Sequence, residues 1–142
     1  MALSRSTWVG LFAEVRVDLL VFVDEFGCAT TMRRSHGRAA RGERVVCRVP
    51  NGHWKTLSTI AAMTARGMTA AATFEGATDT DMFVAFVHGA LLPTLRAGDV
   101  VVMDNLSVHH AVEVSRLIEG VGARLLHLPP CSPDLNPSEM AI

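Results

Sequence analysis

The sequence predicts an α/β protein built around one mixed β-sheet that helices cover. Three observations support this fold class. Two apolar runs have the length of buried strands: residues 19–24 end in Asp24, and residues 100–103 are followed directly by Asp104. Glycine- and proline-marked turns divide residues 44–74 into segments that suit an antiparallel meander. Helical patterns then alternate with strand patterns, which is typical of a sheet with a parallel portion.

The first half of the chain is predicted to supply the meander. Residues 25–43 are polar and contain three glycines, so they suit a loop or an irregular hairpin. The turn Pro50-Asn51-Gly52 separates two strand patterns. The predicted strands of this half lie at 19–24, 44–49, 56–64 and 68–74.

The second half is predicted to alternate helices and strands. Thr78, with Asp81 three residues later, forms a capping pattern that opens a helix, and Gly98 follows its end. Asn136 and Pro137 carry the start signals of a last helix. The apolar face of the first helix comprises Phe83, Phe86, Val87, Ala90 and Leu91, and the remaining predicted elements are strands at 100–103 and 123–128 and a helix at 110–119.

Length and composition indicate one globular domain. The chain has 142 residues, of which 49% are hydrophobic and 19% charged, which excludes the disordered and collagen-like classes. No apolar run approaches the roughly 18 residues that span a bilayer, and charged residues interrupt the N-terminal segment. We therefore expect a cytoplasmic protein with no membrane partner.

The three cysteines are widely spaced and form no C-x-x-C pair, which argues against a disulfide framework or a structural zinc site. The charges, by contrast, are unevenly distributed. Residues 31–60 contain seven basic side chains and one acidic side chain, whereas the rest of the chain contains six basic and thirteen acidic ones. The basic block suits contact with a polyanion, and a solvated arginine-rich loop is the alternative.

Asp24 and Asp104 are the most informative residues. If their strands are neighbours, both carboxylates enter one small volume, where like charges need a cation such as Mg²⁺ or Mn²⁺. The alternative is that each aspartate only caps the following turn. Glu139 is equally ambiguous by itself, because at the third helical position after Asn136 it suits a capping box.

Three segments resemble the catalytic domain of DDE transposases, and in particular the bacterial insertion-sequence group related to mariner elements. These segments are VFVDE at 21–25, VVMDNLSVH at 101–109 and LPPCSPDLNPSE at 128–139. The last two acids are separated by 34 residues, a spacing typical of that group. The resemblance covers residues 19–142, and residues 1–18 form a short lead-in.

The resemblance implies a ribonuclease-H-like fold in which Asp24, Asp104 and Glu139 are the catalytic, metal-binding triad. Two Mg²⁺ ions, which Mn²⁺ can replace, would activate the attacking oxygen and stabilise the leaving oxygen during DNA cleavage and strand transfer. Asn105 and His109 match the family motif and are accessory candidates. The candidates for gripping the DNA backbone are Arg33, Arg34, Arg38, Arg41, Arg44 and Arg48.

The sequence departs from a complete transposase in two ways. Residues 1–18 are too few for a helix-turn-helix module, so a homo-oligomer or a separate chain would supply recognition of the element ends. The chain stops at Ile142, soon after Glu139, so we expect a C-terminally truncated catalytic domain. The alternatives are an inactive remnant that binds DNA or a partner chain, and a different metal-dependent nuclease, against which the proline-rich third segment argues. The resemblance implies a bacterial, nucleoid-associated location.

Overall fold

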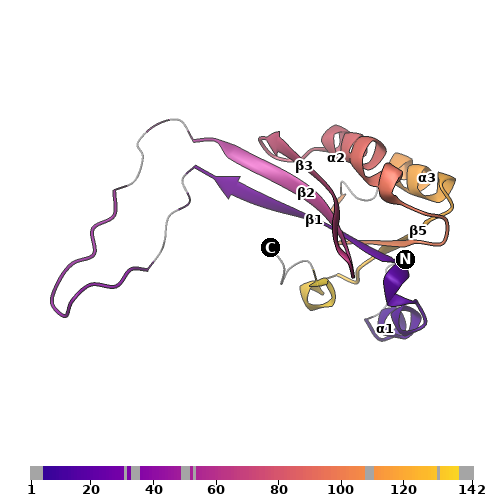
Figure 1. Cartoon of the computed structure of the whole chain (residues 1–142), viewed down its shortest axis with the longest axis horizontal. Helices are drawn as coiled ribbons and strands as arrows, with labels where there is room; N and C mark the ends of the chain where they lie inside the picture. The colour runs from indigo at the N-terminus through magenta and orange to yellow at the C-terminus, as the bar shows by residue number, and fades with distance from the viewer. Residues whose placement is uncertain are drawn as a thin grey trace.

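A five-stranded mixed sheet forms the centre of the protein (Figure 1). The computed structural model describes residues 5–30, 32, 36–48, 52, 54–107, 111–130 and 132–137. The strand order is β3-β2-β1-β4-β5; β1, β2 and β3 pair antiparallel, whereas β1 with β4 and β4 with β5 pair parallel. The strands are β1 (Leu20–Ala29), β2 (Thr56–Thr64), β3 (Gly67–Glu75), β4 (Val100–Met103) and β5 (Arg124–His127).

Helices lie on both faces of this sheet. In Figure 1, α2 and α3 lie above the sheet, and α1 lies below it beside the short turn at Pro133–Leu135. No described helix is long and apolar enough to cross a membrane. The helices are α1 (Arg5–Ala13), α2 (Thr80–Phe86) and α3 (Val112–Gly120); α2 continues as a π-helical turn at Val87–Leu91 and a 3-10 turn at Leu92–Thr94, and further 3-10 turns lie at Val17–Leu19 and Pro133–Leu135.

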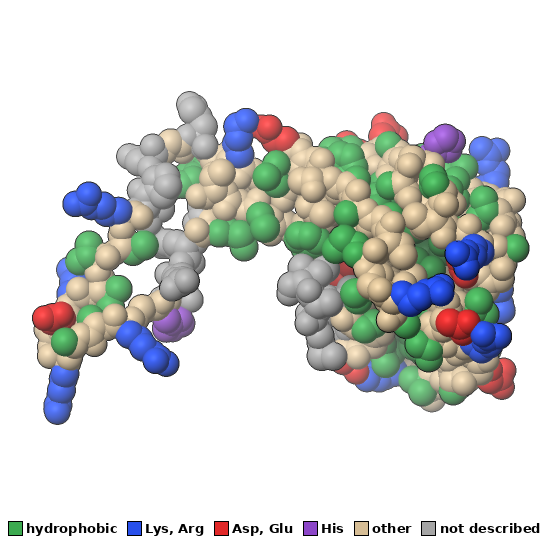
Figure 2. All heavy atoms as spheres, in the orientation of Figure 1, with side chains coloured by type: hydrophobic (Ala, Val, Ile, Leu, Met, Phe, Trp, Pro, Cys, Tyr) green, Lys and Arg blue, Asp and Glu red, His purple; other side chains and the backbone are tan. Residues whose placement is uncertain are grey.

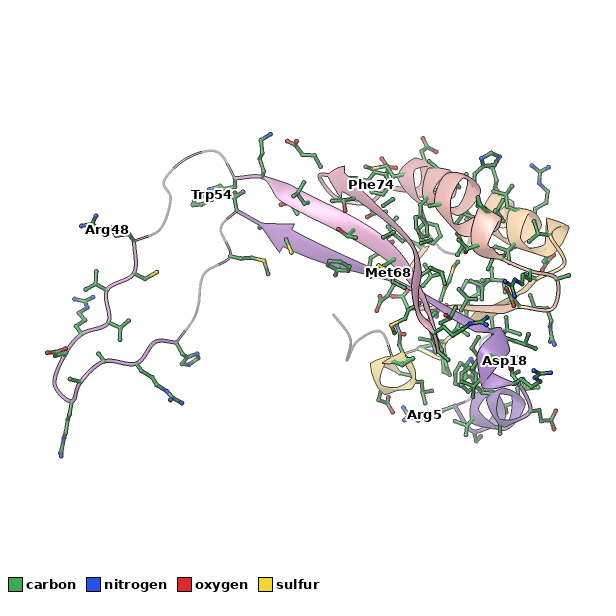
Figure 3. All side chains as sticks on the ribbon, viewed as in Figure 1. Arg5, Asp18, Arg48, Trp54, Met68 and Phe74 are labelled. Atoms are coloured by element: carbon green, nitrogen blue, oxygen red, sulfur yellow. The ribbon has the colours of Figure 1, made fainter. Side chains whose placement is uncertain are left out.

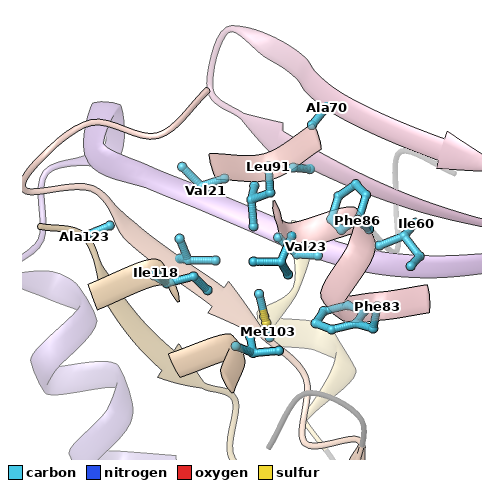
Figure 4. Packing of buried hydrophobic residues seen from close by; sticks show 14 residues of the cluster. Val21, Val23, Ile60, Ala70, Phe83, Phe86, Leu91, Met103, Ile118 and Ala123 are labelled. Carbon is cyan, nitrogen blue, oxygen red and sulfur yellow. The ribbon is translucent and has the colours of Figure 1, made fainter. Parts of the chain in front are cut away.

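Two apolar clusters hold these layers together, one on each face of the sheet. Because successive strand residues point to opposite faces, β1 contributes Val21 and Val23 to one cluster and Leu20 and Phe22 to the other. The larger cluster packs the sheet against α2 and α3 (Figure 4). The smaller cluster packs it against α1, whose Trp8 is 1% exposed. The predicted mixed sheet covered by helices is confirmed.

The strand predictions at 56–64, 68–74, 100–103 and 123–128 are confirmed within one or two residues. The prediction of a strand at 44–49 is wrong for its described residues, 44–48, which belong to no helix or strand. The edge of β2 that it would occupy is taken by β1 itself, which continues past Asp24 to Ala29 and pairs with β2 as far as Thr56. Residues 25–29, predicted as loop, are therefore strand.

Two helix starts also differ from the prediction. Asp79 rather than Thr78 is the N-cap of α2, because its backbone is extended and its carboxylate accepts a hydrogen bond from the Met82 amide at 2.8 Å. Within the described residues, the Thr78 hydroxyl is buried without a hydrogen-bond partner. The helix predicted to begin at residue 110 begins at Val112.

Candidate active site

Asp24 and Asp104 lie on neighbouring strands. β1 and β4 pair parallel with Val23 opposite Met103, so the next residue on each strand is one of the two aspartates. The sequence predicted that Asp24 ends its strand. Asp24 instead lies inside β1, opposite Ala61 of β2. Asp104 directly follows β4. The acids therefore meet in the middle of the sheet, where the antiparallel and parallel halves join.

The side chain of Asp24 points to the α1 face of the sheet. Alternation along β1 places it on the side of Leu20 and Phe22, and its contacts agree. One carboxylate oxygen accepts a hydrogen bond from the Glu25 amide at 2.8 Å. The other accepts one at 3.0 Å from the side-chain amide of Asn136, which is 4% exposed. Asp24 is thus oriented by its own strand and by a segment distant in sequence.

Asp104 is anchored by the turn that follows β4 and by β5. Its carboxylate accepts a hydrogen bond from the Leu106 amide at 3.2 Å, the turn-capping role that the sequence left open. Its carbonyl oxygen lies 3.3 Å from Nδ1 of His127, and because a carbonyl only accepts, the ring nitrogen is the donor. The Leu128 amide donates to the Met103 carbonyl at 2.8 Å, which continues the β4–β5 pairing up to the acid.

Of the remaining predicted catalytic and accessory residues, the structure describes only Asn105. Asn105 is exposed in the turn directly after Asp104. Glu139 and His109 lie outside the described residues. No group of three His, Cys, Asp or Glu side chains within the described part of the chain is arranged to hold a metal ion. What the fold brings together is the pair Asp24 and Asp104.

The basic block projects away from the acids. Residues 36–48 are exposed and run outward beyond the paired ends of β1 and β2, as the ribbon in Figure 1 shows. We call residues 36–48 the arm. Figure 2 shows basic side chains, all of them arginines by sequence, spaced along the arm, and Figure 3 labels Arg48 near its base. The predicted DNA-contacting residues Arg38, Arg41, Arg44 and Arg48 lie on the arm, and Arg33 and Arg34 lie outside the described residues.

Sequence reasoning missed two residues that contact the acids, Asn136 and His127. The sequence indicates Asn136 only as a helix cap, although it lies within the third of the three motif segments, and its burial is a tertiary effect. His127 carries no local signal, because a histidine at the end of a predicted strand is as compatible with a core position as with a site. Only the pairing of β4 with β5 brings His127 to Asp104.

The segment that carries Asn136 is tied to α1 by an ion pair. The Arg5 guanidinium donates to both carboxylate oxygens of Asp134, one contact measuring 3.0 Å. The Arg5 hydrogen bonds and charge lower the pKa of Asp134 below its usual range, and Asp134 in turn raises the pKa of Arg5. Both side chains are more than half exposed, so solvent weakens this pair.

The family model of the DDE superfamily endonuclease matches residues 19–142, the range that contains both acids and the third segment. The chain belongs to this family. A comparison with curated protein sequences found no match. The resemblance carried by the three sequence segments is therefore confirmed at the level of the DDE family.

Solved structures of the Mos1 mariner transposase share the fold of this DDE domain. The Mos1 paired-end complex with the left transposon end aligns with a TM-score of 0.74 at 17% identity, covering 95% of this chain and 43% of that one. The Mos1 paired-end complex with Mg aligns at 0.70 and 17% identity, covering 94% and 42%. The Mos1 catalytic domain alone aligns at 0.62 and 16% identity, covering 95% and 61%.

These likenesses identify the sheet as ribonuclease-H-like, as predicted. The DDE domain spans about two fifths of the length of the Mos1 chains in the two complexes. At such low identity the shared property is the fold.

Proposed function

We propose that this DDE domain is the catalytic domain of a transposase and performs metal-dependent DNA strand cleavage and strand transfer. The observation that carries the proposal is the position of Asp24 in β1 beside Asp104, the residue that directly follows the parallel neighbour β4, inside a domain of the DDE family. Because the backbones at Asp24 and Asp104 are neighbours, a cation bound between the two carboxylates would offset their mutual repulsion. The Mos1 complex solved with Mg supports the same interpretation by analogy of fold.

The donor chemistry at the acids fits a hard divalent cation. Asp24 and Asp104 offer carboxylate oxygens, the ligands that Mg²⁺ and Mn²⁺ prefer. Glu139 is the proposed third ligand, from the matching position of the third segment. When bound, Mg²⁺ or Mn²⁺ would supply charge stabilisation for an in-line displacement at a phosphodiester.

Other residues of this chain would orient the acids for this reaction. Asn136 and the Glu25 amide hold the Asp24 carboxylate in one orientation before a ligand arrives, which lowers the cost of ordering it later. The His127 ring holds the backbone carbonyl of Asp104 by a hydrogen bond. Asn105 and His109 are proposed accessory residues near the turn that follows β4. Water as the nucleophile would give strand cleavage, and a DNA 3′-hydroxyl would give strand transfer.

DNA is the proposed partner, and the arm is its proposed contact. Arg38, Arg41, Arg44 and Arg48 present positive charge on an exposed segment beyond the sheet, which suits contact with backbone phosphates rather than with bases. Arg33 and Arg34 belong to the same proposed basic block. Element ends and target DNA are the proposed DNA partners, and a second copy of this chain or a separate chain is the proposed protein partner.

The proposal is tested by Mn²⁺ binding and plasmid nicking with the full 142-residue chain. Mn²⁺ titration calorimetry should show binding by wild type that Asp24→Asn and Asp104→Asn each abolish or weaken by about tenfold or more. Supercoiled plasmid should be nicked only with Mg²⁺ or Mn²⁺, and not by either variant. Asp81→Asn is the matched control, because it removes one exposed carboxylate from the first turn of α2 and should leave binding unchanged.

Equal Mn²⁺ affinity in wild type and Asp104→Asn would contradict the proposed metal site. Binding of plasmid without any metal-dependent nicking would instead favour the alternative of a chain that keeps the fold and binds DNA without cutting it. Nicking that is indifferent to both Asp24→Asn and Asp104→Asn would trace the activity to a contaminant.

A further inference from the structure

Helix α1 lies outside the matched family range, yet it contacts both segments that hold the acids. Arg5 and Trp8 are three residues apart, so they lie one turn apart on the same side of the helix. Figure 3 shows Arg5 on the side of α1 near the Pro133–Leu135 turn. Trp8 is 1% exposed and stacks on Phe12 at a ring-centroid distance of 4.5 Å. The helix is therefore anchored by an apolar contact and presents two polar groups to the domain.

The first of these groups leads to Asp24. Arg5 binds both carboxylate oxygens of Asp134, and Asn136, two residues further on, donates its side-chain amide to Asp24 at 3.0 Å. Only Leu135 lies between Asp134 and Asn136. Leu135 is held in a 3-10 turn by the hydrogen bond of its amide to the Ser132 carbonyl. A shift of Asp134 would therefore be transmitted to Asn136 with little slack.

The second group leads to Asp104. The indole Nε1 of Trp8 donates to the backbone carbonyl of His127 at 3.1 Å, at the end of β5. The ring of the same His127 donates to the Asp104 carbonyl at 3.3 Å. One side of α1 is thus linked to Asp24 through residues 134–136 and to Asp104 through His127.

We propose that Arg5 and Trp8 of α1 are positioning residues that set the orientation of Asp24 and Asp104 through Asn136 and His127. Neither residue would touch a metal ion or DNA at the acids. The proposal rests on the proposed function only in its consequence for metal binding, because the hydrogen bonds themselves are present without metal. Its first test therefore needs no metal at all.

The first test observes the Asn136 side-chain amide by ¹H–¹⁵N NMR in metal-free buffer. The chain has three asparagines and no glutamine, so its spectrum contains only three side-chain amide pairs, and loss of one in Asn136→Ala assigns the signal. Asp24→Ala should shift that signal by removing the charged acceptor without adding a further side-chain amide. Arg5→Ala should shift it in the same direction, and the charge-swapped double variant Arg5→Asp with Asp134→Arg should move it back toward wild type.

Arg16→Ala is the matched control. Arg16 forms a comparable exposed ion pair with Asp18, two residues away, and that pair leads to neither acid. An Asn136 signal that stays at the wild-type position in Arg5→Ala, or that moves equally in Arg16→Ala, would overturn the Arg5 route.

The second test measures Mn²⁺ affinity by titration of the same variants and of Trp8→Phe. Arg5→Ala should weaken binding about two- to fivefold, the range expected of an exposed ion pair. Trp8→Phe keeps a ring but removes the donor to His127, and it should weaken binding about tenfold, as loss of a hydrogen-bonded support of a metal ligand does. Unchanged affinity in Trp8→Phe would overturn the Trp8 route. Absence of Mn²⁺ binding in wild type would contradict the proposed function, while the NMR test would still decide the Arg5 route.

Discussion

The side-chain amide of Asn136 donates a hydrogen bond to the carboxylate of Asp24 at 3.0 Å, across 112 residues of sequence. Asn136 is buried to 4% exposure on the α1 face of the sheet, next to the first of the two acids that the fold brings together. Through this hydrogen bond, the third sequence segment (residues 128–139) contacts the site by way of Asn136, independently of Glu139. It also gives the first prediction a defined atom pair.

Asn136→Asp should make the stability of the domain dependent on divalent cations. The substitution places a second carboxylate within hydrogen-bond distance of Asp24, and like charges at this range disfavour the folded state unless a cation joins them. We expect a lower Tm than for Asn136→Ala without metal, and a larger rise in Tm on adding millimolar Mn²⁺. Asn136→Ala, which loses the bond without adding charge, should cost about 1–3 kcal/mol of unfolding free energy. Equal metal responses of the two variants would argue against a cation at Asp24.

Met103→Ala should destabilise the whole domain. Met103 is fully buried beneath the helices and directly precedes Asp104, so the truncation opens a cavity at the centre of the sheet. We expect a loss of about 2–5 kcal/mol in the unfolding free energy from urea titration. Met68→Ala is the control, because Met68 is 64% exposed and its truncation should change stability by less than about 0.5 kcal/mol. Similar losses in the two variants would contradict the assigned core.

Replacing the four arm residues Arg38, Arg41, Arg44 and Arg48 by Gln should weaken DNA binding without changing Tm. Because neutralising a phosphate releases counterions, the slope of log affinity against log salt should fall by up to about 0.9 for each phosphate that the variant no longer neutralises. Fluorescence anisotropy with a labelled duplex at several salt concentrations measures both quantities.

The control removes the same charge from exposed positions off the arm, namely Arg66, Arg96, Arg116 and Arg124. It should lower affinity less and should retain more of the salt slope. A control as damaging as the arm variant would show that net charge, rather than the arm, governs DNA binding.

The Arg5–Asp134 pair should contribute stability only above the acid range. Arg5 lowers the pKa of Asp134, so the folded state favours the ionised carboxylate. The contribution is therefore complete above the ordinary aspartate pKa of about 3.9 and is lost as pH falls through the lower, folded value. We expect a small difference in urea midpoint between wild type and Arg5→Ala that is constant from about pH 5 to 7 and vanishes near about pH 2. A difference that persists at the acid end would mean that Arg5 acts through contacts other than this pair.

Sequence patterns predict most of the sheet because its strands bury continuous apolar runs, which leave a local signature. The strands at 56–64 and 100–103 have the predicted bounds. The predicted strand at 44–49 is wrong for its described residues, 44–48, because β-branched residues in a row indicate a strand only if a neighbouring strand is free to pair. Val46, at 82% exposure, lies where no such neighbour exists among the described residues.

The sequence by itself determined the family, the mixed α/β fold and the two acids, because each depends on residue types at fixed spacings along the chain. The tertiary structure decided which strands are neighbours, and therefore that Asp24 lies within β1 beside the residue that follows β4. It also decided that Asn136 and His127 contact these acids and that Trp8 of α1 contacts His127. Those contacts join residues more than 20 positions apart, and no local pattern encodes a hydrogen bond whose partners meet only when the sheet and its covering layers have packed.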